Sequence, residues 1–191
     1  MTPMNTELQT QQVFRTVMRA MSNPGTIYRC DAGKQGMTAL QLIAETLFDQ
    51  DVTFCVIGDD QAGELEDWVY ERTKSPMAEP SRADFIIVTG GSSRGRLLSA
   101  KRGSPEYPDD SATVLFSVEA LASGTDGDYS ARLSGPGILD TKLIRIEGLD
   151  HGDLRQLQAM NSAYPLGIDS VFIDAHGRML CLPRSTKIEV R

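Results

Sequence analysis

Short, almost continuously apolar segments alternate with amphipathic ones in the first half of the chain, and this alternation constrains the fold most strongly. Phe85–Val88 contains no polar residue, which is typical of a central strand covered on both faces. Val52–Ile57 and Thr113–Val118 are predicted as further strands of the same sheet, and more strands cluster in the second half. The sequence therefore predicts an α/β protein with a mixed sheet between two layers of helices, a three-layer α/β/α arrangement.

Apolar residues at helical spacing, together with turn residues, place the remaining elements. Residues 7–21 carry apolar side chains at i, i+3, i+4 and i+7, which predicts a helix with one inward stripe. That stripe consists of Phe14, Val17, Met18 and Met21. Thr38 and Gln41 fit a capping box that opens a second helix. The other predicted helices are 61–72, 96–101 and one after His151, and the other predicted strands are 26–30, 129–133, 143–146, 170–173, 178–182 and 186–190.

Length and composition indicate one globular domain. The 191 residues fit a single domain spanning 1–191, and 40% apolar with 24% charged residues is an ordinary composition. With 26 acidic and 19 basic residues the net charge is -7, which excludes a basic nucleic-acid binder. The apolar runs are far shorter than a membrane span, and the N-terminus lacks the apolar run of a signal peptide. We expect a cytoplasmic protein with no nucleic-acid or membrane partner.

The cysteines form an odd set, in which no two residues stand at a metal-ligand spacing. They are Cys30, Cys55 and Cys181. This pattern predicts buried free thiols in a reducing compartment and no bound metal. His151 lies between two carboxylates, but Asp150 and Asp153 are expected to cap the helix that follows them.

A glycine- and serine-rich segment after the predicted strand 85–88 offers an enzymatic alternative. Residues 91–95 match the G-x-S-x-G pattern of a nucleophile elbow, which would place Ser93 on a tight turn between strand and helix. Asp150 and His176 follow in the order Ser, Asp, His, so the alternative function is a small α/β-type serine hydrolase. The same segment fits a phosphate-binding turn or a plain loop, and it lacks the ending of a P-loop.

Three turn-like segments are more constrained than connecting loops require. Residues 134–138 bracket a proline with two glycines, residues 164–169 lead into an apolar strand, and residues 183–186 separate two strands. Each segment fits ordinary turn chemistry, and each would also let the backbone approach a ligand or a partner closely.

These three segments, preceded by a motif over residues 14–25, resemble the signature of the PhnH family, a subunit of the bacterial carbon–phosphorus lyase. The first motif reads Phe14-Arg15 through Met18, then Met21-Ser22-x-Pro24-Gly25. The motifs stand in the family's order, end with Ile188-Glu189-Val190, and span nearly the whole chain. The resemblance implies a fold like the large domain of pyridoxal-phosphate-dependent transferases without that cofactor, and a homodimer that joins sister subunits in a core complex.

The resemblance also implies a reaction. The complex uses ATP, replaces its adenine with the phosphonate at ribose C1, and forms α-D-ribose 1-methylphosphonate 5-triphosphate. No catalytic residue is assigned to this subunit, so the resemblance implies no activity of the isolated chain and no cofactor within it. The five lysines show no motif implying a Schiff base, which agrees with a missing pyridoxal phosphate.

The motifs supply the candidate residues for binding a ligand or a partner. They are Arg15, Arg19, Gly135, Gly137, Gly167, Asp169 and Arg184. The arginines would offset the negative charge of the chain near a phosphonate, phosphate or partner carboxylate, and the glycines would permit close backbone approach. Asp169 is expected to hold an arginine or backbone N–H groups. If the motifs serve one role, most of them should lie near one surface; the alternatives are four independent turns, and a solvated face for Arg15 and Arg19.

Overall fold

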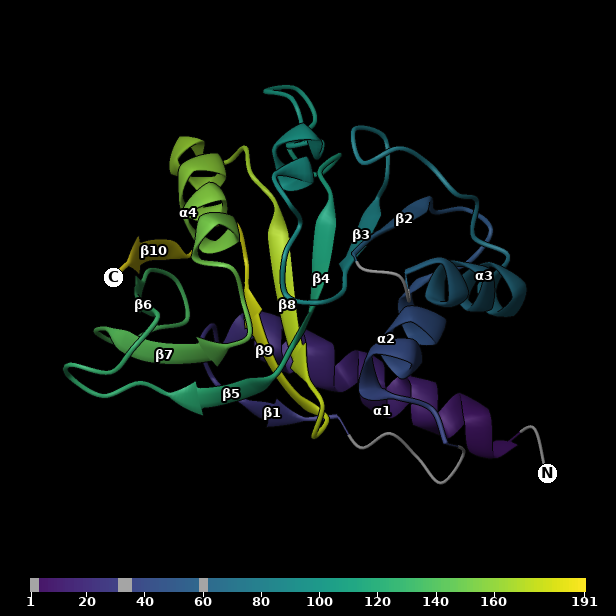
Figure 1. Cartoon of the computed structure of the whole chain (residues 1–191), viewed down its shortest axis with the longest axis horizontal. Helices are drawn as coiled ribbons and strands as arrows, with labels where there is room; N and C mark the ends of the chain where they lie inside the picture. Colours follow the sequence, from purple (N-terminus) through teal and green to yellow (C-terminus); the bar gives the residue numbers. More distant parts are fainter. Residues whose placement is uncertain (1–3, 31–35, 59–61) are drawn as a thin grey trace.

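The computed structural model describes residues 4–30, 36–58 and 62–191, and within these ranges it contains two β-sheets and four α-helices (Figure 1). The helices are α1 (Met4–Ser22), α2 (Ala39–Leu47), α3 (Ala62–Thr73) and α4 (His151–Met160). The strands of the larger sheet are β1 (Tyr28–Arg29), β2 (Phe54–Ile57), β3 (Phe85–Val88), β4 (Thr113–Val118), β8 (Asp169–Asp174) and β9 (Arg178–Leu182). The strands of the smaller sheet are β5 (Ala120–Ser123), β6 (Ala131–Ser134), β7 (Lys142–Glu147) and β10 (Lys187–Val190). The fold is therefore mixed α/β.

The larger sheet has the strand order β1-β9-β8-β4-β3-β2. Strands β2, β3, β4 and β8 run parallel, whereas at one edge β9 pairs antiparallel with β8 and β1 pairs antiparallel with β9. Its register aligns rows of apolar residues across the sheet. One row is Val56, Ile87, Leu115, Val171 and Cys181, and the next is Ile57, Val88, Phe116, Phe172 and Leu180. Because successive side chains point to opposite faces, the two rows fill two separate cores, and both faces are buried.

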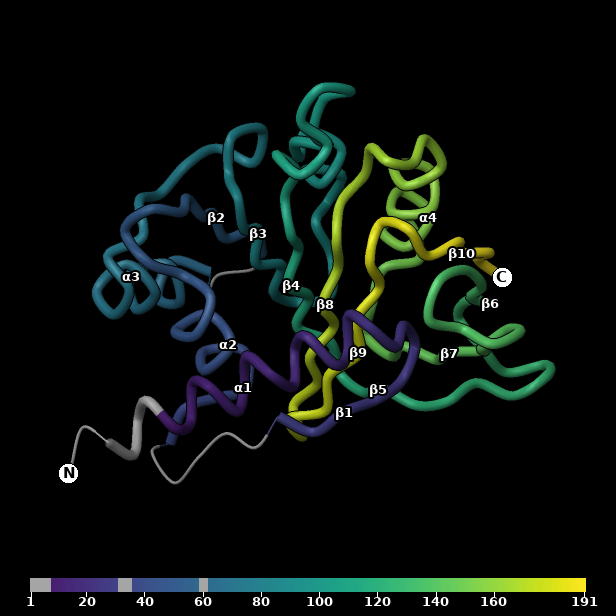
Figure 2. Tube along the Cα trace, turned by 180° about the vertical axis from the view of Figure 1, so that it is seen from behind, coloured from purple at the N-terminus to yellow at the C-terminus, as the bar shows by residue number. Residues whose placement is uncertain are grey.

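Different layers cover the two faces. Helices α1, α2 and α3 pack on the face that carries the first row, and α1 lies across β9 in the view of Figure 2. Helix α4 and the smaller antiparallel sheet, with the order β10-β6-β7-β5, pack on the other face. The sequence predicted a single mixed sheet between helices. The second sheet is a correction, and it arises because inward-facing residues of β6 and β7, such as Leu133 and Ile144, bury against the larger sheet rather than extending it.

The orientation of α1 also differs from the prediction. Its buried residues are Val13, Val17 and Ala20, whereas Phe14 and Met18 are 49% and 50% exposed. The predicted helical period is right, and Val17 and Met21 of the predicted stripe do pack on the core. Phe14 and Met18 face solvent instead, because the buried stripe is rotated toward Val13 and Ala20. Both stripes have helical spacing, and the observed one has the smaller side chains, which let the helix approach the sheet closely.

The predicted caps of α2 and α4 are formed, although not by every residue that was expected to form them. Thr38 Oγ1 accepts a hydrogen bond from the Gln41 N–H at 3.2 Å, and Gln41 Oε1 accepts one from the Thr38 N–H at 2.9 Å, so the capping box is confirmed. Asp150 caps α4 by accepting from the Gly152 N–H at 2.8 Å, whereas Asp153 turns to another partner described below. Residue 61, the predicted start of α3, lies outside the described residues.

All three cysteine side chains are buried thiols. Burial raises the pKa of Cys55 to about 12 and raises that of Cys181 further above its ordinary value. Because the thiolate is the reactive form, a disulfide-exchange reagent at pH 8 should modify the folded chain slowly. After denaturation without reductant, three thiols per chain should react at once. Fewer than three would contradict the assignment.

Candidate functional site

The N-terminal motif packs against the loop that follows β6. A Cβ atom on Gly137 would lie 2.6 Å from the Ser22 carbonyl oxygen and 2.8 Å from Pro24 Cδ. A Cβ atom on Gly25 would lie 2.6 Å from Leu133 Cδ1. Both glycines have positive φ, +79° for Gly137 and +71° for Gly25, so other residues would be strained there as well as crowded. Close contact between segments over a hundred residues apart thus requires glycine on both sides.

Polar contacts tie the same motif to both sheets. Lys142 Nζ on β7 donates to the Pro24 carbonyl oxygen at 3.2 Å and to Thr26 Oγ1 at 2.5 Å. The Gly25 N–H donates to the carbonyl oxygen of Cys181 on β9 at 3.3 Å. The segment after α1 therefore joins the larger sheet to the smaller one.

Gly135 extends this contact to the C-terminal motif. Its φ is +121°, and a Cβ atom there would lie 3.0 Å from the Ser185 carbonyl oxygen. The neighbouring Arg184 pairs with Asp169, whose Oδ2 lies 2.7 Å from Arg184 Nη2 and whose Oδ1 accepts from the Arg184 N–H at 2.8 Å. Arg184 Nη1 also donates to the Pro108 carbonyl oxygen. The guanidinium and the carboxylate hold chain segments together, and their binding to a ligand stays a prediction.

Gly167 completes the arrangement through Asn161, a residue that the sequence analysis did not single out. Asn161 Oδ1 accepts from the Ile168 N–H at 2.9 Å, and Asn161 Nδ2 donates to the Ile168 carbonyl oxygen at 3.1 Å. A Cβ atom on Gly167 would lie 2.5 Å from Asn161 Oδ1 and 3.2 Å from Arg184 Cβ. In the sequence, a polar residue just before the segment 164–169 could have indicated a side chain that bonds to the backbone of that segment.

The structure thus brings five of the seven candidates into one connected group, which we call the motif cluster. Its segments are 22–26, 135–138, 167–169 and 184–186. Arg15 and Arg19 lie elsewhere, on the exposed side of α1 with Phe14 and Met18. Residues 8–30 contain three arginines and no acidic residue, although the whole chain has a net charge of -7. The exposed face of α1 is therefore both apolar and basic.

The glycine–serine segment does not form a nucleophile elbow with a histidine. Ser93 is fully buried, its Oγ donates to Asp153 Oδ1, and its N–H donates to Asp153 Oδ2 at 2.6 Å. Burial raises the pKa of Asp153, which is itself 1% exposed. Ser92 Oγ donates to Asp150 Oδ2 at 2.9 Å. The alternative Ser93–Asp150–His176 set is therefore not formed, because the Ser93 hydroxyl is buried and donates to Asp153 instead of to a histidine. The Ser93 N–H, which the phosphate-binding alternative would have used, donates to Asp153 instead.

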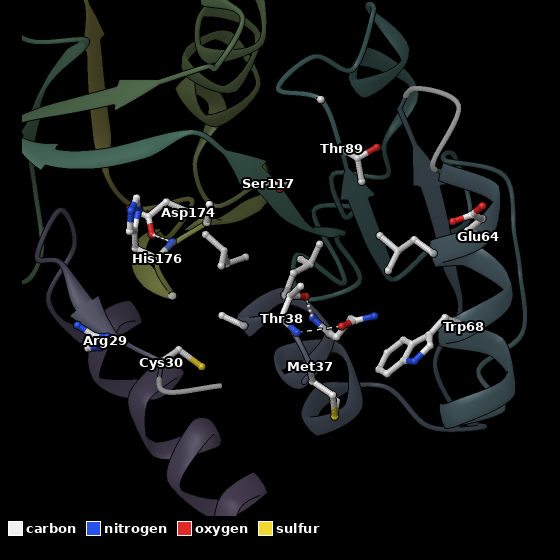
Figure 3. Close-up of a pocket in the computed structure, with 18 residues that line it drawn as sticks. Arg29, Cys30, Met37, Thr38, Glu64, Trp68, Thr89, Ser117, Asp174 and His176 are labelled. Atoms are coloured by element: carbon white, nitrogen blue, oxygen red, sulfur yellow. Dashed lines mark hydrogen bonds between the residues drawn. The ribbon is translucent and has the colours of Figure 1, made fainter. Parts of the chain in front are cut away.

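A cavity of about 1040 Å³ lies at the carboxyl ends of the parallel strands (Figure 3). Thr89 follows β3, Ser117 lies on β4, and Asp174 ends β8, while Thr38 begins α2 on the opposite wall. In open α/β sheets ligands bind in this place, because loops beyond the strand ends bring side chains from several strands together. None of the seven candidate residues lines this cavity. In the sequence, polar residues at the ends of the predicted strands could have indicated this cavity.

Asp174 anchors the hairpin that forms one wall. It accepts from the N–H groups of His176 and Arg178 at 2.9 Å and from Arg178 Nε at 2.6 Å. The Leu121 N–H donates to the same carboxylate at 3.2 Å. Burial alone would raise the pKa of Asp174, but these donors outweigh burial and lower it below its ordinary value of 3.8.

This lowered pKa has a consequence for stability. The contribution of the Asp174 carboxylate is present above pH 3.8 and is lost as the pH falls through the lowered pKa of the folded state. We expect Asp174→Asn to lower the free energy of unfolding by about 2 kcal/mol at pH 7, and by progressively less below about pH 4. Urea unfolding at several pH values measures this. Asp128→Asn, at an exposed carboxylate, is the control and should change the free energy of unfolding only slightly. If Asp174→Asn lowered the free energy of unfolding by the same amount at every pH down to about 2, the assignment would be contradicted.

Among the described residues, no group of three or more histidine, cysteine, aspartate or glutamate side chains is arranged to hold a metal ion. None of the helices in the same ranges is long and apolar enough to cross a membrane.

Comparison with known proteins gives the class of the chain. Residues 4–189 match the family described as bacterial phosphonate metabolism protein (PhnH), so the chain belongs to the PhnH family. A relative from Stutzerimonas stutzeri named putative C-P lyase subunit protein HtxG is 31% identical over 183 residues, which cover 95% of this chain and 86% of the relative. The alpha-D-ribose 1-methylphosphonate 5-triphosphate synthase subunit PhnH of Rhizobium meliloti (strain 1021) is 29% identical over 186 residues, covering 95% of this chain and 90% of that protein.

Proposed function

We propose that this chain is a non-autonomous subunit of the carbon–phosphorus lyase core complex. In that role it supports the reaction in which a phosphonate oxygen bonds to ribose C1 of ATP while the bond from C1 to adenine breaks. The observation that carries the proposal is the family match over residues 4–189, together with two relatives whose names state that they are subunits.

The arrangement of the motifs supports a subunit role. Gly135 and Gly137 allow backbone segments to touch, whereas Gly25 and Gly167 leave room for neighbouring side chains. The Asp169–Arg184 pair fixes the segment after β9. These residues maintain a shape instead of presenting a nucleophile, an acid and a base around one point. A protein that presents a fixed surface to its partners needs residues of this kind.

The exposed face of α1 is our candidate for contact with a sister subunit or with a second copy of the chain in a homodimer. Phe14 and Met18 project from the same side of the helix as Arg15. Exposed large apolar residues with a basic rim are typical of protein interfaces.

Within the complex we propose a cytoplasmic protein with no cofactor of its own. Its parallel strands flanked by helices support a likeness to the large domain of pyridoxal-phosphate-dependent transferases.

A genetic experiment tests the proposal. Deleting the gene should abolish growth of its host on methylphosphonate as the phosphorus source and leave growth on phosphate unchanged, and a plasmid copy should restore it. A tagged copy should retain the sister subunits through purification. Undiminished growth on methylphosphonate without the gene would contradict the proposal. The serine hydrolase is not proposed, because Ser93 is buried.

A further inference from the structure

The cavity at the carboxyl edge of the larger sheet has two chemically different ends. Arg29 and His176 lie at one end, whereas Glu64 and Trp68 of α3 lie at the other, with Thr38 between them (Figure 3). We propose that this cavity binds a nucleoside phosphate whose base carries an amino group. This inference deepens the proposed function and rests on it for its biological setting, because the complex acts on a nucleotide.

The first end suits an anionic group. Arg29 and His176 bring cationic or hydrogen-bond-donating side chains from β1 and from the β8–β9 hairpin. The start of α2 lines the same cavity, and the N–H groups of Ala39 and Leu40 in its first turn have no acceptor within the helix. Such groups, together with the helix dipole, attract phosphate oxygens.

A nearby carboxylate does not cancel this positive potential. Asp174 also lines the cavity, but its oxygens already accept from Arg178 Nε and from three backbone N–H groups. Its negative charge is balanced locally by the Arg178 guanidinium at 2.6 Å. The carboxylate therefore adds little repulsion toward an anion at this end of the cavity.

The second end suits a planar ring that donates hydrogen bonds. The half-buried Trp68 lines the cavity together with Leu65 and Met37, so aromatic and apolar surface is available for stacking. Glu64, one helical turn before Trp68, presents an exposed carboxylate that accepts from an amino group. An aminoalkylphosphonate would match both charges, but it would leave the Trp68 wall and most of the volume unfilled. A nucleotide with an amino-bearing base uses both ends and the wall.

Trp68 is the only tryptophan of the chain, so its fluorescence reports directly on this cavity. We expect ATP to quench that fluorescence saturably in the full-length chain. UTP, whose base has no amino group, and 2-aminoethylphosphonate, which has no ring, should bind more weakly by about tenfold. Absence of an ATP-dependent change would overturn the proposal, and so would equal binding of ATP and UTP.

Substitutions of residues that line the cavity test whether ATP binds there. Glu64→Gln should weaken ATP binding by about tenfold and leave UTP binding unchanged, whereas Arg29→Gln should weaken both nucleotides by a similar factor. Asp67→Asn removes the same charge from α3 outside the cavity and should change neither. His176→Gln replaces Arg29→Gln if circular dichroism shows that the latter does not fold. ATP binding that is insensitive to Glu64, Arg29 and His176 would place the nucleotide elsewhere and overturn the proposal.

Failure of this inference is separable from failure of the proposed function. A gene that restores growth on methylphosphonate, encoding a chain that does not bind ATP, would overturn the cavity assignment and leave the subunit role intact. Cavity-dependent ATP binding by a chain whose gene is dispensable for that growth would support the cavity and contradict the subunit role.

Discussion

Replacing Gly91 with alanine should lower the free energy of unfolding by more than about 4 kcal/mol or prevent folding altogether. A Cβ atom at this position would lie 1.6 Å from the Gly148 carbonyl oxygen, and φ of Gly91 is +69°. The atom that it would meet belongs to the backbone, which cannot turn away as a side chain can. The contact also brings the Asp150 N–H to 2.8 Å from the Gly91 carbonyl oxygen, so relieving the clash would break that bond.

Gly95→Ala is the matched control. Gly95 also has positive φ, +81°, but no neighbouring atom lies within 4 Å of the position that a Cβ atom would take there. Gly95→Ala should therefore lower the free energy of unfolding only by the strain of an alanine in the left-handed conformation, about 1 kcal/mol. Urea unfolding followed by far-ultraviolet circular dichroism measures both variants. Equal decreases in the free energy of unfolding of the two variants would show that the close approach of residues 91 and 148 does not determine the stability.

Removal of the Asp169 carboxylate should lower the free energy of unfolding by about 3 kcal/mol. Asp169→Ala leaves the Arg184 guanidinium, whose side chain is 18% exposed, without its carboxylate partner and the Arg184 N–H without its acceptor. The guanidinium keeps its hydrogen bond to the Pro108 carbonyl oxygen. Unpaired charges that are largely removed from water are destabilising because their hydration is not replaced. Since this pair fixes the segment that touches Gly135, the variant should also reduce retention of the sister subunits.

A double-mutant cycle separates the pair from the individual residues. Asp169→Ala, Arg184→Ala and the double variant should give a coupling energy of about 2 kcal/mol. The exposed pair Lys74–Glu71, with side chains 60% and 73% exposed, provides a comparison and should give less than about 0.5 kcal/mol. A coupling energy near zero for Asp169 and Arg184 would contradict the structural role assigned to them.

Elements with a local cause could be predicted from the sequence. The capping box at Thr38 and Gln41 depends on residues three positions apart, and the apolar run of β3 needs no distant information. β5 was missed because Ala120–Ser123 has no β-branched residue and gains its strand conformation from pairing with β7. On α1 the period was evident, but packing against α2 and β9 decided which stripe faces inward.

The candidate site was predictable only in part, and for a similar reason. Because they are glycines, Gly135, Gly137 and Gly167 were predicted to permit close approach of other segments. Their spacing along the chain does not indicate which segments approach them. The G-x-S-x-G pattern was misleading because the partner of Ser93 is Asp153, one helical turn beyond Asp150. The cavity gathers single residues from many elements, so no contiguous motif marks it.

Formation of α-D-ribose 1-methylphosphonate 5-triphosphate by the purified sister subunits, with and without this chain, tests the subunit role most directly. Phosphorus nuclear magnetic resonance follows the phosphonate, and chromatography follows the released adenine. With ATP and methylphosphonate present, we expect equal amounts of both products from the complete set, and neither from the set without this chain or from the chain alone. Unchanged product formation in its absence, or turnover by the isolated chain, would contradict its assignment as a required, non-autonomous subunit.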